Sequence, residues 1–232
     1  MVTSTDVWGS VVKAVGGDAV SVTALIDSPA KDPHDYETNS LDAAKISKAK
    51  LVVYNGNGYD DFFAKAVAAV GRNQKRLVAF DVSGKQKSSN TNEHVFYDLP
   101  TVKQVADAVA AQLSKLNGAR KDTFTANATK FNAQIDGLAD TAKQIGAMHP
   151  NQSVVATEPV ADYLLELAGV KDVTPEAFEE AVEADQDIPA QAAADVHSLI
   201  SGRKVAALIN NAQTETGTTN ELKAAAARAG VP

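Results

Sequence analysis

A chain of 232 residues with 44% hydrophobic residues is long enough for one large domain or two small ones with a sizeable core, which argues against disorder. Its 22 Lys and Arg against 29 Asp and Glu give a formal charge of -7, which repels phosphate backbones and argues against nucleic acid as a partner. The sequence has no Cys, so thiolate catalysis, disulfides and Cys-type zinc sites are excluded, and any metal must be held by His, carboxylate, carbonyl or water.

The first hundred residues alternate short runs rich in β-branched residues with helical stretches, a pattern typical of an α/β layer with a parallel sheet. Strands are predicted at Val20–Ile26, Leu51–Tyr54 and Leu77–Phe80. Helices are predicted after Asp6 up to the Gly16–Gly17 stop, after Ser40 as an N-cap, and from Tyr59 to about Val70. We therefore expect residues 1–100 to form an N-terminal α/β lobe.

Residues 101–148 show helical spacing and no predicted strand. Apolar residues recur at steps of three and four, at Val102, Val105, Val109, Leu113 and Leu116, and again at Phe124, Ala128, Phe131, Ile135, Leu138 and Ile145. Such a segment is either a helical cap packed on the sheet or a rigid connector between two lobes. We prefer the connector, because α/β alternation resumes after it.

The remaining segment, residues 149–232, is predicted to form a second α/β lobe. Strands are predicted at Ser153–Ala156 and Lys204–Ile209, and helices near Val160–Ala168, Pro189–Ile200 and Glu221–Ala229. The expected fold is therefore of the α/β class, with two lobes that each contain a mainly parallel sheet and surrounding helices, joined by a long connecting helix.

Two of the four histidines follow predicted strands. His34 lies in the segment Asp-Pro-His-Asp-Tyr-Glu after the strand that ends at Ile26, and His94 lies in Asn-Glu-His-Val-Phe-Tyr-Asp after the strand that ends at Phe80. Loops from the carboxyl ends of parallel strands converge on one crevice, so these histidines can share a metal site. Nearby carboxylates can accept the ring N–H groups and orient the other nitrogens toward a cation; they are Asp35, Glu37, Glu93 and Asp98. The alternative is a pair of ordinary loop histidines beside solvated acids.

Glu158 is a candidate third ligand, because it directly follows the predicted strand Ser153–Ala156 and precedes a helix. Taken alone, it is more simply a charge that offsets a helix macrodipole. The other histidines, His149 and His197, are expected at the surface. Asn-Gly-Asn-Gly at residues 55–58 is interpreted as a turn, since the third glycine of a dinucleotide loop is missing.

These segments resemble the solute-binding proteins of manganese, zinc and iron ABC importers, the family also described as adhesin-like lipoproteins. The resemblance runs along the whole chain and is most specific at Pro33-His34-Asp35-Tyr36-Glu37. The other matching segments are Val7-Trp8-Gly9 with Gly16-Gly17-Asp18, Ala49-Lys50-Leu51-Val52-Val53-Tyr54-Asn55-Gly56, Gly58-Tyr59-Asp60-Asp61, His94-Val95-Phe96-Tyr97-Asp98 and Thr157-Glu158-Pro159.

The resemblance implies two lobes joined by one long helix, with a metal bound in the cleft between them. Its first two ligands match His34 and His94, and its third, a His or Glu after the first strand of the second lobe, matches Glu158. Its fourth ligand, a carboxylate or His, follows one further strand. No residue is assigned to that position, because Pro232 comes where the strand would begin. The resemblance therefore implies that the second lobe is incomplete at its carboxyl end.

The function that the resemblance implies is capture of Mn²⁺ or Zn²⁺, with Fe²⁺ as a further candidate, and delivery to an ABC permease in the membrane by a monomeric, non-enzymatic subunit. The polar loop Lys85–Asn92 lacks the His-rich insertion of many zinc members, which favours manganese. Metal affinity is expected to fall below about pH 6 as His34 and His94 protonate. Two alternatives are a metallohydrolase, because two His and one Glu also describe open catalytic zinc sites, and a surface adhesin.

The expected location is extracytoplasmic, at the cell surface or in the periplasm. No apolar run reaches the roughly 18 to 20 residues that a membrane helix needs. Neither a charged n-region nor an apolar h-region precedes Val7-Trp8-Gly9, as expected if an export signal has been removed. A lipid anchor is expected on the full-length precursor.

Overall fold

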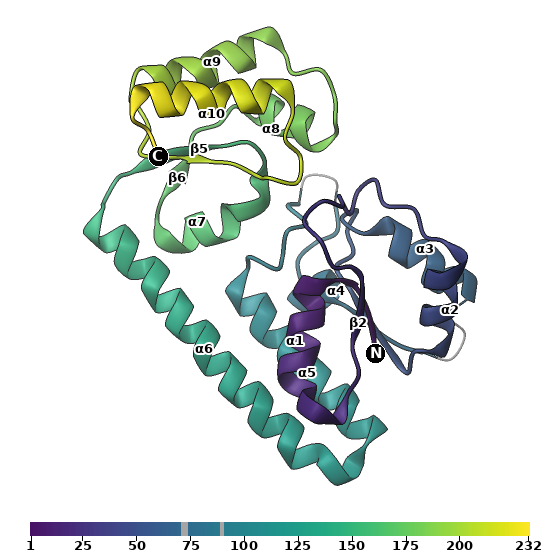
Figure 1. Ribbon diagram of the computed structural model, residues 1–232. Coiled ribbons are helices and arrows are strands. Elements are labelled where there is room, and N and C mark those ends of the chain that lie inside the picture. Colours follow the sequence, from purple (N-terminus) through teal and green to yellow (C-terminus); the bar gives the residue numbers. More distant parts are fainter. Residues whose placement is uncertain (71–73, 89–90) are drawn as a thin grey trace. The chain divides into compact units, whose positions relative to one another are not determined.

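The computed structural model of the protein describes residues 1–70, 74–88 and 91–232 (Figure 1). The chain divides into two compact units, Met1–Leu138 and Ala139–Pro232. The finer division into 1–100, 101–148 and 149–232 stays a prediction. Residues 89–90 of the polar loop predicted at 85–92 lie outside the described part of the chain.

The first unit is built on a parallel sheet with the strand order β2-β1-β3-β4. Its strands are β1 (Val2–Thr5), β2 (Thr23–Ile26), β3 (Leu51–Tyr54) and β4 (Lys75–Val78). The chain passes from β1 to β2 on one side and then to β3 and β4 on the other. In such a sheet the switch point between β1 and β3 is where ligands bind, outside the carboxyl ends of the strands.

Strand β1 was not predicted from the sequence. Its four residues, Val-Thr-Ser-Thr, carry one apolar side chain, yet all four are buried, because this strand is paired on both sides by β2 and β3. Strand β3 has the predicted bounds. The strand predicted at Leu77–Phe80 is partly wrong: β4 ends at Val78, and Ala79 and Phe80 begin a short helix whose Phe80 N–H donates to Asn55 O at 2.9 Å.

Helices cover both faces of this sheet (Figure 1). The helices of this unit are α1 (Asp6–Gly16), α2 (Ser40–Lys48), α3 (Asp61–Val70), α4 (Ala79–Ser83), α5 (Leu99–Leu116) and the first part of α6 (Lys121–Met148). Helices α2 and α3 bury Ile46, Phe63 and Val67 against the strand residues Leu25 and Val52. Full burial of one such side chain stabilises the fold by about 1.5 to 3 kcal/mol.

Helix α2 begins with a capping box whose N-cap lies one residue before the predicted N-cap. Asn39, not Ser40, is the N-cap: its side chain accepts the N–H groups of Leu41 and Asp42 at 2.9 and 3.1 Å. The Asp42 carboxylate in turn accepts the Asn39 N–H at 3.3 Å. This reciprocal pair satisfies N–H groups that the first helical turn leaves unpaired.

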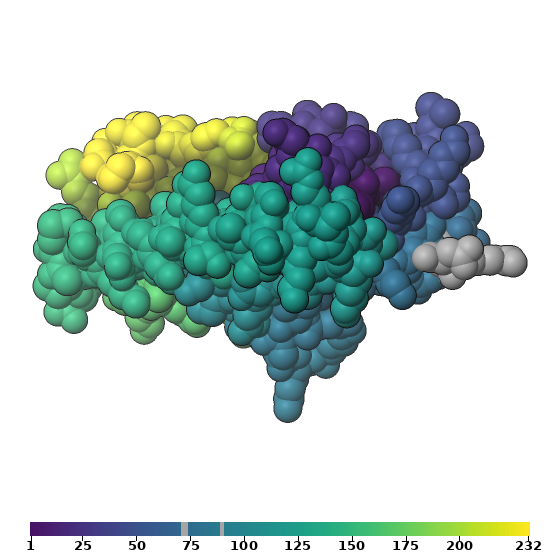
Figure 2. All heavy atoms as spheres, turned by 90° about the horizontal axis from the view of Figure 1, so that it is seen from below, coloured from purple at the N-terminus to yellow at the C-terminus, as the bar shows by residue number. Residues whose placement is uncertain are grey.

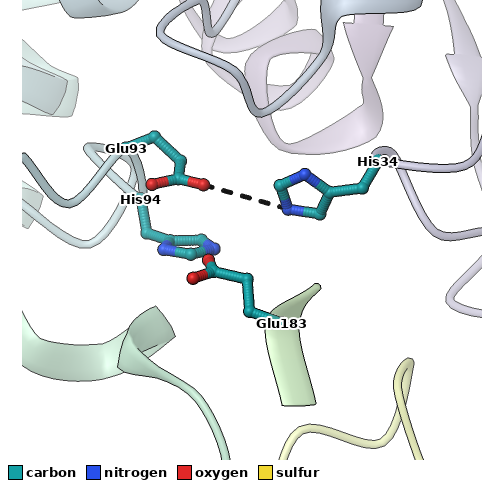
Figure 3. Close-up of side chains that lie close together, drawn as sticks. All are labelled: His34, Glu93, His94 and Glu183. Atoms are coloured by element: carbon teal, nitrogen blue, oxygen red, sulfur yellow. Dashed lines mark ion pairs between the residues drawn. The ribbon is translucent and has the colours of Figure 1, made fainter. Parts of the chain in front are cut away.

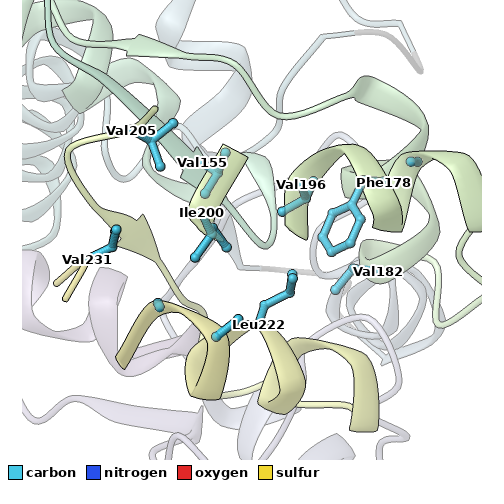
Figure 4. Close-up of a cluster of buried hydrophobic side chains, with 11 residues drawn as sticks. Val155, Phe178, Val182, Val196, Ile200, Val205, Leu222 and Val231 are labelled. Carbon is cyan, nitrogen blue, oxygen red and sulfur yellow. The ribbon is translucent and has the colours of Figure 1, made fainter. Parts of the chain in front are cut away.

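The second unit is a smaller parallel sheet with the strand order β6-β5-β7. Its strands are β5 (Ser153–Ala156), β6 (Lys171–Asp172) and β7 (Leu208–Ile209), and its further helices are α7 (Asp162–Ala168), α8 (Glu176–Glu183), α9 (Ala190–Ser201) and α10 (Gly217–Ala229). Figure 4 shows its buried core, in which Phe178 of α8 and Ile200 of α9 pack with Val155 of β5 and Leu222 of α10. Strand β7 is shorter than the predicted strand at 204–209, and β6 and α8 were not predicted.

Helix α6 has 28 residues, and the boundary between the two units falls inside it after Leu138. Near its start, the Asn127 side chain donates to Val15 O of α1 at 2.9 Å. Near its end, Gly146 lies close to the Ala168 carbonyl of α7. Figure 2 shows the side chains of α6 in teal at the surface. Within the described ranges, no helix is long and apolar enough to cross a membrane.

Candidate metal centre

His34 lies on the loop that follows β2. Its backbone N–H donates to Asp32 Oδ1 at 2.8 Å, and the intervening Pro33 is buried. The hydrogen bond and the buried proline hold the backbone of this turn in place. His94 lies on the segment that leads into α5 and is 2% exposed. Both histidines therefore follow the carboxyl side of the sheet, as predicted, although β2 and β4 are its two opposite edge strands.

The structure brings these two histidines together within the first unit. Their ring centroids are 6.4 Å apart. The buried ring of Tyr59 contacts both of them edge-on, with centroid distances of 5.3 Å to His34 and 5.4 Å to His94. Since Tyr59 lies two residues before α3 and is buried, it holds the spacing of the two imidazoles.

Glu93 lies beside the two imidazoles. Its Oε1 is 4.0 Å from His34 Nε2, and its side chain is 17% exposed. Figure 3 shows its carboxylate and the rings of His34 and His94 directed toward one another. One potential ligand atom from each of these residues lies within 4.8 Å of the others. Glu183, also drawn there, belongs to the second unit.

The orientation of the His94 ring is set by Asn92. Asn92 Oδ1 accepts the His94 backbone N–H at 2.9 Å and lies 2.8 Å from His94 Nδ1. Because this oxygen already acts as an acceptor, His94 Nδ1 must donate to it. The proton of the neutral ring is thus on Nδ1, and the lone pair that can bind a metal is on Nε2.

Carboxylates were expected to orient the rings, but in the described residues none of the four accepts a hydrogen bond from a ring nitrogen, and Glu93 Oε1 stays 4.0 Å from His34 Nε2. In the part of the chain that the structure describes, Asp35 and Glu37 are exposed and make no hydrogen bond to a ring nitrogen. Asp98 instead pairs with Lys85 at 3.1 Å and accepts the Thr101 hydroxyl at 2.5 Å. The Asn92 amide orients the His94 ring instead. Asn92 lies two residues before His94, so its side chain can close a local turn and reach the ring as well.

A buried polar network under the site fixes the backbone at Glu93. Asn55, at the end of β3, donates through Nδ2 to Glu93 O at 2.8 Å, and its Oδ1 accepts from Trp8 Nε1 at 3.3 Å. The Asp60 carboxylate accepts the N–H groups of Asn55 at 2.6 Å and Gly56 at 2.8 Å. Burial raises the pKa of Asp60, against the opposing effect of these hydrogen bonds.

The sequence analysis had interpreted residues 55–58 only as a turn. A turn is present, and Gly56 has φ 86°, a left-handed value that favours glycine. A Cβ at Gly56 would also lie 2.5 Å from Val78 Cγ1. The role of Asn55 and Asp60 could have been suspected only from polar residues at the end of a buried strand.

The environment of His94 favours its neutral form. Burial, followed by the charge of His34, lowers the pKa of His94 to about 3. This lowered pKa argues against protonation of His94 near pH 6, because burial disfavours the charged imidazole. A neutral ring is the form that binds metal.

Glu158 lies in the second unit, directly after β5, and is 5% exposed. Asn211 donates its side-chain amide to Glu158 Oε2, and the Asn211 N–H donates to Thr157 Oγ1 at 2.9 Å. Among the residues that the structure describes, Glu158 Oε1 is buried and has no hydrogen-bond partner. The side chain makes no capping hydrogen bond to the short helix that follows. Its environment therefore differs from that of a solvated charge at a helix start.

The two remaining histidines are exposed, as predicted. His149 follows the end of α6, and His197 lies on the outer face of α9. Neither approaches a group of potential ligands in the described part of the chain.

Comparison with protein families and curated proteins gives consistent matches. A family model described as zinc-uptake complex component A, periplasmic (ZnuA), matches residues 1–232. A metal ABC transporter substrate-binding lipoprotein of Lactococcus lactis subsp. lactis is 26% identical over 171 residues, which cover 68% of this chain and 54% of the relative. The manganese ABC transporter substrate-binding lipoprotein PsaA of Streptococcus pneumoniae is 24% identical over 184 residues, covering 73% and 59%. The chain thus spans little more than half the length of these relatives.

Solved structures share the fold. The periplasmic zinc binding protein TroA from Treponema pallidum has a TM-score of 0.82 at 19% identity, covering 99% of this chain and 83% of TroA. A crystal structure of ZnuA has a TM-score of 0.80 at 20% identity, covering 97% and 87%. At this identity the likeness concerns the fold alone. It confirms the predicted α/β class with parallel sheets, surrounding helices and a long connecting helix.

Proposed function

Because the chain belongs to the family of the periplasmic component A of zinc-uptake complexes (ZnuA), we propose that it captures a divalent transition metal and delivers it to the membrane permease of an ABC importer. The metal is Mn²⁺ or Zn²⁺, with Fe²⁺ as a further candidate, and is cargo rather than a resident cofactor. The substrate-binding role is supported by the names of the relatives. The proposal includes an extracytoplasmic location, a lipid anchor on the precursor, a monomeric state and no enzymatic activity.

The observation that carries the proposal is the pair of imidazoles in the first unit. His34 and His94 come from loops far apart in the sequence, yet their rings are 6.4 Å apart. His94 is held as the tautomer that presents Nε2, and burial keeps it neutral. Neutral imidazoles suit Zn²⁺ and Fe²⁺ and, together with carboxylate oxygen, Mn²⁺.

Glu158 is proposed as the ligand from the second unit. This assignment follows the resemblance of Thr157-Glu158-Pro159 to the family's third-ligand segment. It is supported by the buried carboxylate, of which one oxygen is held by Asn211 while the other has no hydrogen-bond partner in the described residues. A buried carboxylate oxygen in this state costs free energy unless a cation or a donor satisfies it.

Thermal denaturation with and without excess Mn²⁺ or Zn²⁺ tests this function. A ligand that binds only the folded state at about 1,000 times its Kd adds about 4 kcal/mol to the free energy of unfolding. We expect a clear rise in Tm for the wild-type chain, loss of that rise in His34→Ala and Glu158→Ala, and no loss in His197→Ala, whose side chain is exposed on α9. Absence of any rise in the wild-type chain with either metal would contradict the proposal.

A further inference from the structure

We propose that Glu93 is itself a metal ligand, so that the first unit supplies a carboxylate oxygen together with the imidazoles of His34 and His94. This inference rests on the proposed function and goes beyond it, because neither the family resemblance nor the sequence pattern gave Glu93 a place in the coordination sphere.

The distances around Glu93 fit coordination. Two ligand atoms that each lie about 2.1 Å from one metal are at most about 4.2 Å apart. Glu93 Oε1 and His34 Nε2 are 4.0 Å apart, and the potential ligand atoms of these two residues and His94 all lie within 4.8 Å of one another. In a tetrahedral set the ligand atoms are about 3.4 Å apart, so the three atoms surround one point and need to approach by up to about 1.4 Å to share one metal.

In this structure Glu93 is not a hydrogen-bond acceptor for His34. A separation of 4.0 Å between Nε2 and Oε1 is too long for a hydrogen bond. The His94 ring, for its part, is oriented by Asn92 through Nδ1. Glu93 is thus close to both imidazoles without the hydrogen bond by which a carboxylate would orient the His34 ring.

The backbone of Glu93 is fixed by two hydrogen bonds to its carbonyl oxygen. Its carbonyl oxygen accepts from Asn55 Nδ2 at 2.8 Å and from the Val95 N–H at 2.6 Å. With the main chain held in this way and the side chain only 17% exposed, the carboxylate has little freedom to turn into solvent. Glutamates are seldom this shielded unless a cation or donor faces them.

Glu93 would also complete the chemistry of the site. With His34, His94 and Glu158 it brings the number of protein ligands to four, the usual number for a closed zinc site. Two carboxylates balance the charge of a divalent cation in a shielded setting. A set of two oxygen and two nitrogen ligands contains more hard ligand atoms than a set with a single carboxylate. Hard oxygen ligands suit Mn²⁺.

The test compares Glu93→Gln with Glu37→Gln in the full chain. Both changes remove one carboxylate charge from the first unit, but Glu37 is exposed and does not belong to the group of potential ligand atoms that contains His34, Glu93 and His94. Binding of Mn²⁺, Zn²⁺ and Co²⁺ is measured by chelator competition, and the absorption spectrum of bound Co²⁺ reports its ligands. We expect Glu93→Gln to weaken binding at least tenfold and to change the Co²⁺ spectrum, whereas Glu37→Gln changes neither. An unchanged Tm of each metal-free variant shows that both are folded.

Other outcomes separate this inference from the function on which it rests. If the wild-type chain binds and His34→Ala does not, but Glu93→Gln keeps the wild-type affinity and spectrum, Glu93 is not a ligand and the proposed function stands. A lower affinity with an unchanged Co²⁺ spectrum means that Glu93 acts only through its charge, which also overturns the inference. Failure of the wild-type chain to bind any of the three metals overturns the function itself.

Discussion

The side chain of Asn92 holds His94 at two points: its Oδ1 accepts the backbone N–H at 2.9 Å and faces the ring Nδ1 at 2.8 Å. One amide oxygen thereby fixes the rotamer, the tautomer and the direction of Nε2. Residues that orient a metal-binding histidine in this way change the metal affinity without touching the metal.

We therefore expect Asn92→Ala to lower the affinity for Mn²⁺ and Zn²⁺ by about 10- to 100-fold. Asn92→Asp keeps an oxygen acceptor at the same place and should retain most of the affinity. Isothermal titration or chelator competition measures both. Equal loss in the two variants would show that Asn92 has some other role, and wild-type affinity in Asn92→Ala would show that the ring needs no such support.

Asp60 stabilises the loop after β3 by accepting the N–H groups of Asn55 and Gly56 in a buried position. Asp60→Ala leaves two buried donors unpaired, which should lower the free energy of unfolding by about 2 to 4 kcal/mol. The neighbouring Asp61→Ala, an exposed change at the start of α3, should cost less than about 1 kcal/mol. Urea denaturation of both variants checks the difference, and equal losses would contradict it.

Two glycines of α6 should respond in opposite ways to a methyl group. A Cβ at Gly146 would lie 1.6 Å from the backbone oxygen of Ala168, whereas nothing lies within 4 Å of a Cβ at Gly137. Gly146→Ala should therefore destabilise the protein by about 1 to 3 kcal/mol. Gly137→Ala should stabilise it by about 0.5 to 1 kcal/mol, because alanine loses less backbone entropy in a helix. Thermal denaturation measures both changes in stability. Two variants that are both stabilised or both destabilised would contradict the prediction.

Glu179 of α8 makes the stability of the second unit depend on pH. Burial, with the charges of Asp172 and Asp162 as the next causes, raises the pKa of Glu179 to about 8 from its usual 4.5. Between these values the folded state holds a proton that the unfolded state has released, so stability falls as the pH rises across this window. Below about pH 4.5 both states hold the proton and the penalty is absent.

Glu179→Gln mimics the protonated form. Its free energy of unfolding should therefore match that of the wild type near pH 5 and exceed it by about 1 to 3 kcal/mol near pH 8. This range is reduced because solvent screens the partly exposed side chain. Urea denaturation at both pH values measures this. Glu180→Gln, a change at the adjacent exposed residue, should show no such trend. A variant no more stable than the wild type near pH 8 would mean that Glu179 ionises normally.

The sequence alone determined the α/β class, the run of helix between the two sheets and the loops that carry the candidate ligands. Local signals were enough for α1, which ends at the predicted Gly16–Gly17 stop, and for β3, which is the apolar β-branched run Leu51–Tyr54. His34 and His94 could be named because a parallel sheet brings the carboxyl ends of its strands to one edge.

Only the tertiary structure decided which atoms meet there. Strand β1 is invisible as a hydrophobic run, since pairing on both sides rather than its own side chains keeps it buried. Asn92, Asn55 and Asp60 look like ordinary turn residues until their hydrogen bonds are seen. Asn92 bonds to His94, Asn55 donates to Glu93 O, and Asp60 accepts the Asn55 N–H. The side chain of Glu93 points to the imidazoles because of a loop conformation that depends on contacts far away in the chain, and no local pattern encodes such contacts.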